Sequence, residues 1–163
     1  MPMADLRNEM EELGFKNVQT LLNSGNVIFD GPSEQEEKLE EKIAAHLEKV
    51  FGFTIPVLIR SEEEILELID ADPFNDSVVT PDIRLYVTFL KKAPESELSL
   101  PWISDDGSYQ IIDVRDRTIC SVLDLSVTNT PKGMDALEKL FGKKHALTTR
   151  NWNTLNRIAK KLS

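Results

Sequence analysis

Apolar residues recur at two different spacings along the first half of the chain. Spacings of three and four residues predict amphipathic helices, and short runs rich in β-branched residues predict strands. Gly14 and Gly52 follow two of the helical stretches, where a left-handed C-terminal cap is expected. Asn23, Gly25 and Asn26 separate two β-prone runs and predict a tight hairpin turn. The elements expected here are helices over 2–13, 33–52 and 61–72, a hairpin over 18–29 and a strand over 55–60.

The second half opens with a loop over 75–81 and then changes pattern. Residues 85–90 are apolar on both faces, which predicts a strand covered on both sides and paired within its sheet. A hairpin is expected over 109–123, and Thr130 and Pro131 have the residue types of an N-cap and a first helical position. Thr148 or Thr149 is expected to cap a last helix. The expected elements are a strand over 85–90, a hairpin over 109–123 and helices over 130–142 and 149–162.

This order predicts an α+β protein with two subdomains, 1–76 and 77–163. The first subdomain has the order helix, strand, strand, helix, strand, which is that of a ferredoxin-like unit without its first strand. The second is expected to hold a small antiparallel sheet followed by two C-terminal helices.

Charge divides the chain unevenly. Acidic residues outnumber basic ones 28 to 19, giving a net charge of −9 that disfavours nucleic acid and anionic membranes as partners. Residues 30–76 have a local balance of −10, and residues 131–163 have a balance of +6. Nucleic acid could therefore bind only through the basic C-terminal region.

Few residues suggest a cofactor or a metal. Cys120 is the single cysteine, so no internal disulfide can form, and His46 and His145 have no recognisable metal-ligand spacing. We expect Cys120 to be a buried structural thiol, no metal or cofactor, and a reducing, cytoplasmic setting. No apolar run approaches the roughly 18 residues of a membrane span.

The candidate binding residues lie in two segments. Arg150 offers a guanidinium suited to carboxylate or phosphate, and the first turn of a following helix would present unpaired N–H groups. The alternative is structural, with Trp152 anchoring the helix in the core. The polar hairpin tip is a second candidate, although a plain turn explains it. The candidate ligand-binding residues are Thr149, Arg150, Asn151, Asn153, Ser24 and Asn26.

Seven short segments resemble a bacterial family, the domain of unknown function 1697. They are Pro2–Leu6, Leu13–Phe15, Ser24–Phe29, Phe51–Phe53, Pro56–Val57, Asp72–Phe74 and Thr148–Thr154. The resemblance implies a cytoplasmic α+β protein with a ferredoxin-like first subdomain, and it implies no reaction. Family members usually have a strand and a Gly-rich loop ahead of the Pro-Met that here follows Met1. We therefore expect an N-terminally shortened version whose sheet lacks that strand.

Three functions remain open at this point. The first is a binding module for an anionic small molecule or an acidic partner. The alternative is an enzyme acting on a phosphorylated or carboxylated small metabolite, for which no nucleophile and base stand together in the sequence. The third is self-association, through oppositely charged helices or an unpaired sheet edge.

Overall fold

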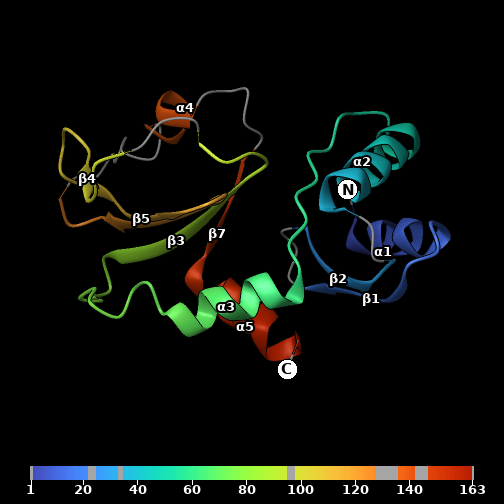
Figure 1. Ribbon diagram of the computed structural model, residues 1–163, viewed down its shortest axis with the longest axis horizontal. Coiled ribbons are helices and arrows are strands. Elements are labelled where there is room, and N and C mark those ends of the chain that lie inside the picture. The colour runs from blue at the N-terminus through green and yellow to red at the C-terminus, as the bar shows by residue number, and fades with distance from the viewer. Residues whose placement is uncertain are drawn as a thin grey trace. The chain divides into compact units, whose positions relative to one another are not determined.

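The protein has an α+β fold with two antiparallel sheets (Figure 1). The computed structural model describes residues 2–21, 25–32, 35–94, 98–127, 136–141 and 147–162. Contacts divide the chain into two compact units, Met1–Ser61 and Glu62–Ser163. None of the helices in the described part has the length and apolar content that a membrane span requires.

The first unit contains a helix, a β-hairpin and a second helix, as the apolar spacing predicts. Gly14 and Gly52 adopt φ angles of 95° and 81° just beyond the two helices, which confirms the expected left-handed ends. Ser33, the first residue of the helix expected over 33–52, lies outside the described residues. The elements are α1 (Met3–Glu12), β1 (Lys16–Leu21), β2 (Asn26–Asp30) and α2 (Glu36–Phe51).

The core of this unit forms where the apolar stripes of both helices meet the hairpin. Burying each large apolar side chain contributes about 1.5–3 kcal/mol, so these contacts hold the helices to the strands. The buried core residues are Leu6, Met10, Phe15, Val18, Leu39, Ile43 and Leu47.

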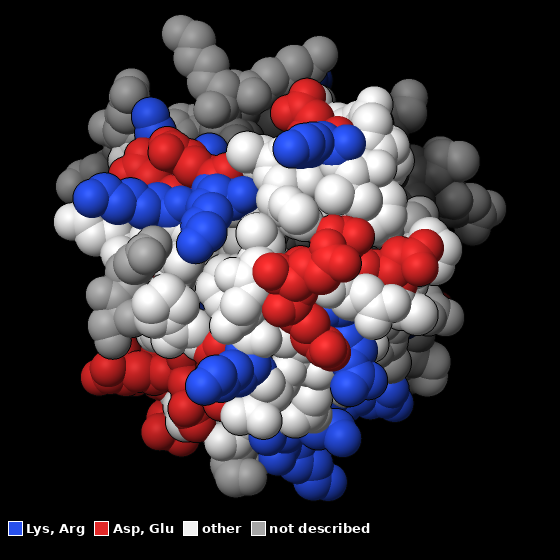
Figure 2. Space-filling model, turned by 90° about the vertical axis from the view of Figure 1, so that its right-hand side faces the viewer, with Lys and Arg blue, Asp and Glu red and all other residues white. Residues whose placement is uncertain are grey.

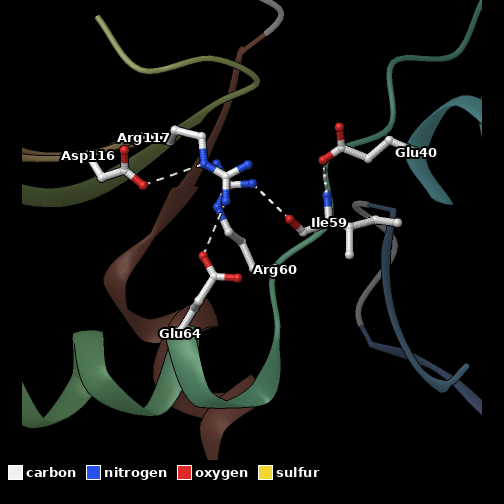
Figure 3. Close-up of polar contacts among 6 residues, drawn as sticks. All are labelled: Glu40, Ile59, Arg60, Glu64, Asp116 and Arg117. Carbon is white, nitrogen blue, oxygen red and sulfur yellow. Dashed lines mark hydrogen bonds and ion pairs between the residues drawn. The ribbon is translucent and has the colours of Figure 1, made fainter. Parts of the chain in front are cut away.

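The strand predicted over 55–60 is absent, and that prediction is wrong. The described residues of the first unit form only the two-stranded sheet of β1 and β2. The backbone N–H of Ile59 instead donates a hydrogen bond to the Glu40 carboxylate on α2, at 2.8 Å (Figure 3). Glu40 is only 2% exposed. A side chain therefore satisfies a backbone donor that a neighbouring strand would satisfy in a sheet.

The second unit is built around a five-stranded antiparallel sheet in the order β4-β5-β6-β3-β7. β3 pairs with β6 on one side and β7 on the other, as the apolar run over 85–90 predicts. The elements are α3 (Glu62–Ala71), β3 (Ile83–Leu90), β4 (Trp102–Ile103), β5 (Tyr109–Arg115), β6 (Thr118–Asp124), α4 (Ala136–Phe141), β7 (Leu147–Asn151) and α5 (Trp152–Leu162).

Helices cover both faces of this sheet. Figure 1 shows α4 on one side and the pair α3 and α5 on the other. The α4 side buries a continuous apolar cluster, and α5 contacts β3 from the opposite side. The buried residues of the α4 side are Leu90, Tyr109, Ile111, Ile119, Leu123, Leu137 and Phe141.

Two strands of the second sheet are missing from the sequence prediction. β4 is only two residues long, and β7 covers the segment where Thr148 or Thr149 was expected to cap the last helix. The cap prediction is wrong because Thr148 and Thr149, which are β-branched, pair with β3 as part of a strand. The helix begins later, at Trp152. Thr130 and Pro131 lie outside the described residues.

The boundary between the units falls at residues 61 and 62, whereas the sequence places it at 76 and 77. α3 packs against α5, so its contacts join it to the second unit. Phe74, just beyond α3, also contacts Trp152 at the start of α5, with ring centroids 5.1 Å apart.

We expect Glu40→Leu to lower the free energy of unfolding of the first unit by about 1–3 kcal/mol, because it leaves the N–H of Ile59 without its acceptor. Glu40→Gln keeps an acceptor oxygen and should lose less. Denaturant unfolding followed by circular dichroism measures both. Glu41→Leu is the matched control, since Glu41 is exposed on the same helix. Equal losses for the Leu and Gln variants would contradict the role assigned to this bond.

Candidate functional site

Asn151 caps α5. Its Oδ1 accepts hydrogen bonds from the backbone N–H of Thr154, at 2.8 Å, and from the Thr154 hydroxyl, at 2.9 Å. This is the geometry of an N-cap residue, whose side chain takes up a free N–H of the first helical turn. The backbone N–H of Thr154, in the helical turn expected to bind an anion, is thus already bonded within the protein.

Thr149 and Arg150 point to opposite faces of the sheet, because neighbouring residues of a strand alternate. Thr149 lies opposite Thr88, and their hydroxyl oxygens are 2.8 Å apart. Arg150 lies opposite Val87, and its Nη1 donates to the Thr148 hydroxyl at 2.7 Å and the Thr149 carbonyl at 3.0 Å. Burial lowers the pKa of the Arg150 guanidinium. The two side chains therefore do not converge on one ligand.

Asn153 lines a surface hollow of about 660 Å³ between α3 and α5. The α3 wall contributes aliphatic side chains, and the α5 wall contributes amides, cations and one small apolar residue. The lining residues are Leu66, Ile69, Asn153, Asn156, Arg157, Ala159 and Lys160.

Charge is unevenly distributed around the molecule. Figure 2 shows that many charged side chains on one face lie in groups of a single sign. Within residues 147–162 there are four basic residues and no acidic one, while α3 has five acidic residues among its ten. The hollow is thus bordered by an acidic helix and a basic one.

The hairpin tip is only partly described. Asn26 is buried, and its Nδ2 donates to the carbonyl of Leu21 at 3.2 Å, which closes the hairpin. Ser24 lies outside the described residues. The contact of Asn26 is structural, in agreement with the turn interpretation.

Cys120 lies in the middle of β6 and is 1% exposed. Burial raises the pKa of its thiol to about 12, and the nearby Asp113 carboxylate acts in the same direction. The thiol is therefore protonated at neutral pH and is a poor nucleophile.

Acidic residues in the β4–β5 turn and on β5 have local partners. Asp106 accepts bonds from both Ser104 and Ser108 side chains, at 2.7 and 2.6 Å, and Asp113 pairs with Arg115. These contacts account for the two carboxylates as parts of turns and strands.

One polar group was missed by the sequence analysis. His46 on α2 lies 2.7 Å from a carboxylate oxygen of Glu9 on α1, although 37 residues separate them. No short motif could reveal this pair, because it forms only when the two helices pack together.

We expect Asn151→Ala to lower stability by about 1 kcal/mol, the usual cost of losing an N-cap side chain. Asn151→Asp keeps the acceptor oxygen and should retain most of that stability. Denaturant unfolding monitored by tryptophan fluorescence measures the change, since Trp152 begins the capped helix. A loss in the Asp variant as large as in the Ala variant would contradict the cap.

We expect Cys120 to react slowly with Ellman's reagent in the native protein at pH 8, and rapidly after denaturation. The thiolate population of the folded protein grows substantially only as the pH approaches about 12. Absorbance of the released thiol measures both rates. Fast stoichiometric reaction of the native protein would show that the thiol is accessible and ionised.

Comparison with known proteins identifies a family and nothing more detailed. A search of curated proteins and a search of solved structures found no match. The model of one protein family matches residues 1–119, which leaves the segment 148–154 outside the matched part. This match covers well over half of the chain and confirms the resemblance seen in the sequence. The chain therefore belongs to the family described as protein of unknown function DUF1697.

Proposed function

We propose that this protein is a binding module that holds a small anionic molecule in the hollow between α3 and α5. The observation that carries the proposal is the lining of that hollow, which combines apolar side chains with amides and two cations. Ligand sites in proteins commonly join an apolar surface to a few polar groups that fix orientation.

The polar lining residues follow helical spacing. Asn153, Asn156, Arg157 and Lys160 stand at positions i, i+3, i+4 and i+7 of α5, so they share one face of the helix. Arg157 can bind a carboxylate or phosphate through two N–H groups. The amides of Asn153 and Asn156 can donate hydrogen bonds to the same group.

The opposite wall selects for an apolar part of the ligand. Leu66 and Ile69 stand three residues apart on α3 and present aliphatic surface. The acidic residues of α3 and the net charge of −9 oppose nucleic acid and other polyanions. We infer a ligand with one carboxylate or phosphate on an apolar body.

We also infer a cytoplasmic setting, since the lone Cys120 cannot pair within the chain.

Hexanoate and hexyl phosphate are suitable probes, with inorganic phosphate for comparison. We expect hexanoate and hexyl phosphate each to raise the midpoint temperature of thermal unfolding of the wild-type protein, and inorganic phosphate to raise it less. In Arg157→Gln/Lys160→Gln the shift should disappear, because the cations of the hollow are lost. Differential scanning fluorimetry and isothermal titration calorimetry measure the effect.

Lys161→Gln is the matched control, since Lys161 is an exposed cation of α5 that does not line the hollow. It should respond to the probes like the wild type. Equal shifts in Arg157→Gln/Lys160→Gln and wild type would exclude the hollow. A shift abolished only by Arg150→Ala would move the anion site to β7, and tight retention of an oligonucleotide would contradict the selection against polyanions.

A further inference from the structure

Three metal-ligating side chains converge in the first unit, whereas the hollow proposed above belongs to the second. Ligand atoms of Glu9, Glu12 and His46 all lie within 4.8 Å of one another. Glu9 and Glu12 stand three residues apart on one face of α1, and His46 reaches them from α2. His46 Nε2 and Glu9 Oε2 are 2.7 Å apart.

The packing of the two helices holds this group in place. Glu9 precedes Met10, and His46 lies between Ile43 and Leu47 on α2; those three apolar residues belong to the same buried core. The side chains of His46 and Glu9 are 25% and 19% exposed, while Glu12 is exposed. Two ligands are thus held at the edge of the core, and the third is open to solvent.

The electrostatics of this place favour a cation. No lysine or arginine of the described ranges pairs with Glu9 or Glu12, whereas the neighbouring Glu11 pairs with Arg7 at 3.0 Å. The last turn of α1 contains no basic residue, although the C-terminal end of a helix attracts positive charge. A cation bound there would offset both the carboxylates and the helix dipole.

We propose that Glu9, Glu12 and His46 form a site for a divalent transition-metal ion of the Zn²⁺ type. One imidazole nitrogen with two carboxylate oxygens suits Zn²⁺, Co²⁺ or Ni²⁺, whereas Mg²⁺ and Ca²⁺ prefer oxygen ligands alone. Tetrahedral Zn²⁺ with bonds of about 2.0–2.1 Å places its ligand atoms about 3.3 Å apart. Small rotations of the three side chains bring them to that spacing. The exposure of Glu12 leaves a fourth position for water or a ligand.

Isothermal titration calorimetry of the full chain, first freed of metal with a chelator, tests the site. We expect one saturable Zn²⁺ site in the wild type and no saturable Mg²⁺ binding. Glu12→Gln, Glu9→Gln and His46→Gln should each weaken Zn²⁺ binding by roughly tenfold or more, since each removes a direct ligand. Co²⁺ absorption should show a bound spectrum in the wild type that the His46 variant loses.

Glu11→Gln and His145→Gln are the controls, because one changes a neighbouring carboxylate and the other removes the second imidazole of the chain. Both should bind Zn²⁺ like the wild type. Circular dichroism without metal verifies folding, and Glu12→Gln, at an exposed position, keeps the experiment decisive if a buried variant unfolds. Absence of saturable Zn²⁺ binding would reduce the group to a Glu9–His46 hydrogen bond. Binding that survives both Glu12→Gln and His46→Gln would likewise overturn the proposal.

Discussion

The second unit depends on the burial of β3 on both of its faces. Val87 and Leu90 have no exposed surface, and their side chains point to opposite sides of the sheet. Such a strand is stable only if helices cover both faces, and α4 and the pair α3 and α5 do so. This requirement brings α3 beside α5, and their packing creates the hollow. The candidate ligand site thus follows from the need to cover one strand.

Sequence patterns predict a helix well where an apolar stripe is followed by a glycine that ends the helix. α1 and α2 end where Gly14 and Gly52 indicate, and the strand over 85–90 is paired on both sides as its two apolar faces require. The failures share a cause. The extended segment at Ile59 bonds to a side chain of α2, and β7 is a polar strand defined by its pairing with β3. Both outcomes are decided by tertiary partners that local spacing does not encode.

The same limit applies to the candidate chemistry. Thr149, Arg150 and Asn151 are consecutive, and on a first helical turn they would gather around one anion. A strand sends Thr149 and Arg150 to opposite faces, and the helix begins one residue after Asn151. Asn153 alone among the predicted C-terminal residues lines the hollow, where Arg157 and Lys160 supply the charge. Likewise, Glu9 and His46 are distant in sequence and meet only through the packing of two helices.

Two ion pairs of Arg117 contribute to this second unit. Arg117, at the turn after β5, reaches Glu64 on α3 at 3.4 Å and Asp116 at 3.7 Å (Figure 3). The contact ties the hairpin to the helix that forms one wall of the hollow. That wall is therefore linked to the sheet by an ion pair, in addition to its packing against α5.

No spacer separates β7 from α5, because Asn151 is both the last residue of the strand and the cap of the helix. Any change in the position of α5 relative to the sheet must therefore be accommodated at Asn151, the end of the edge strand β7. Thr149, whose hydroxyl pairs with that of Thr88, lies two residues before Asn151. The start of α5 and the end of the edge strand are in this way fixed by one and the same residue.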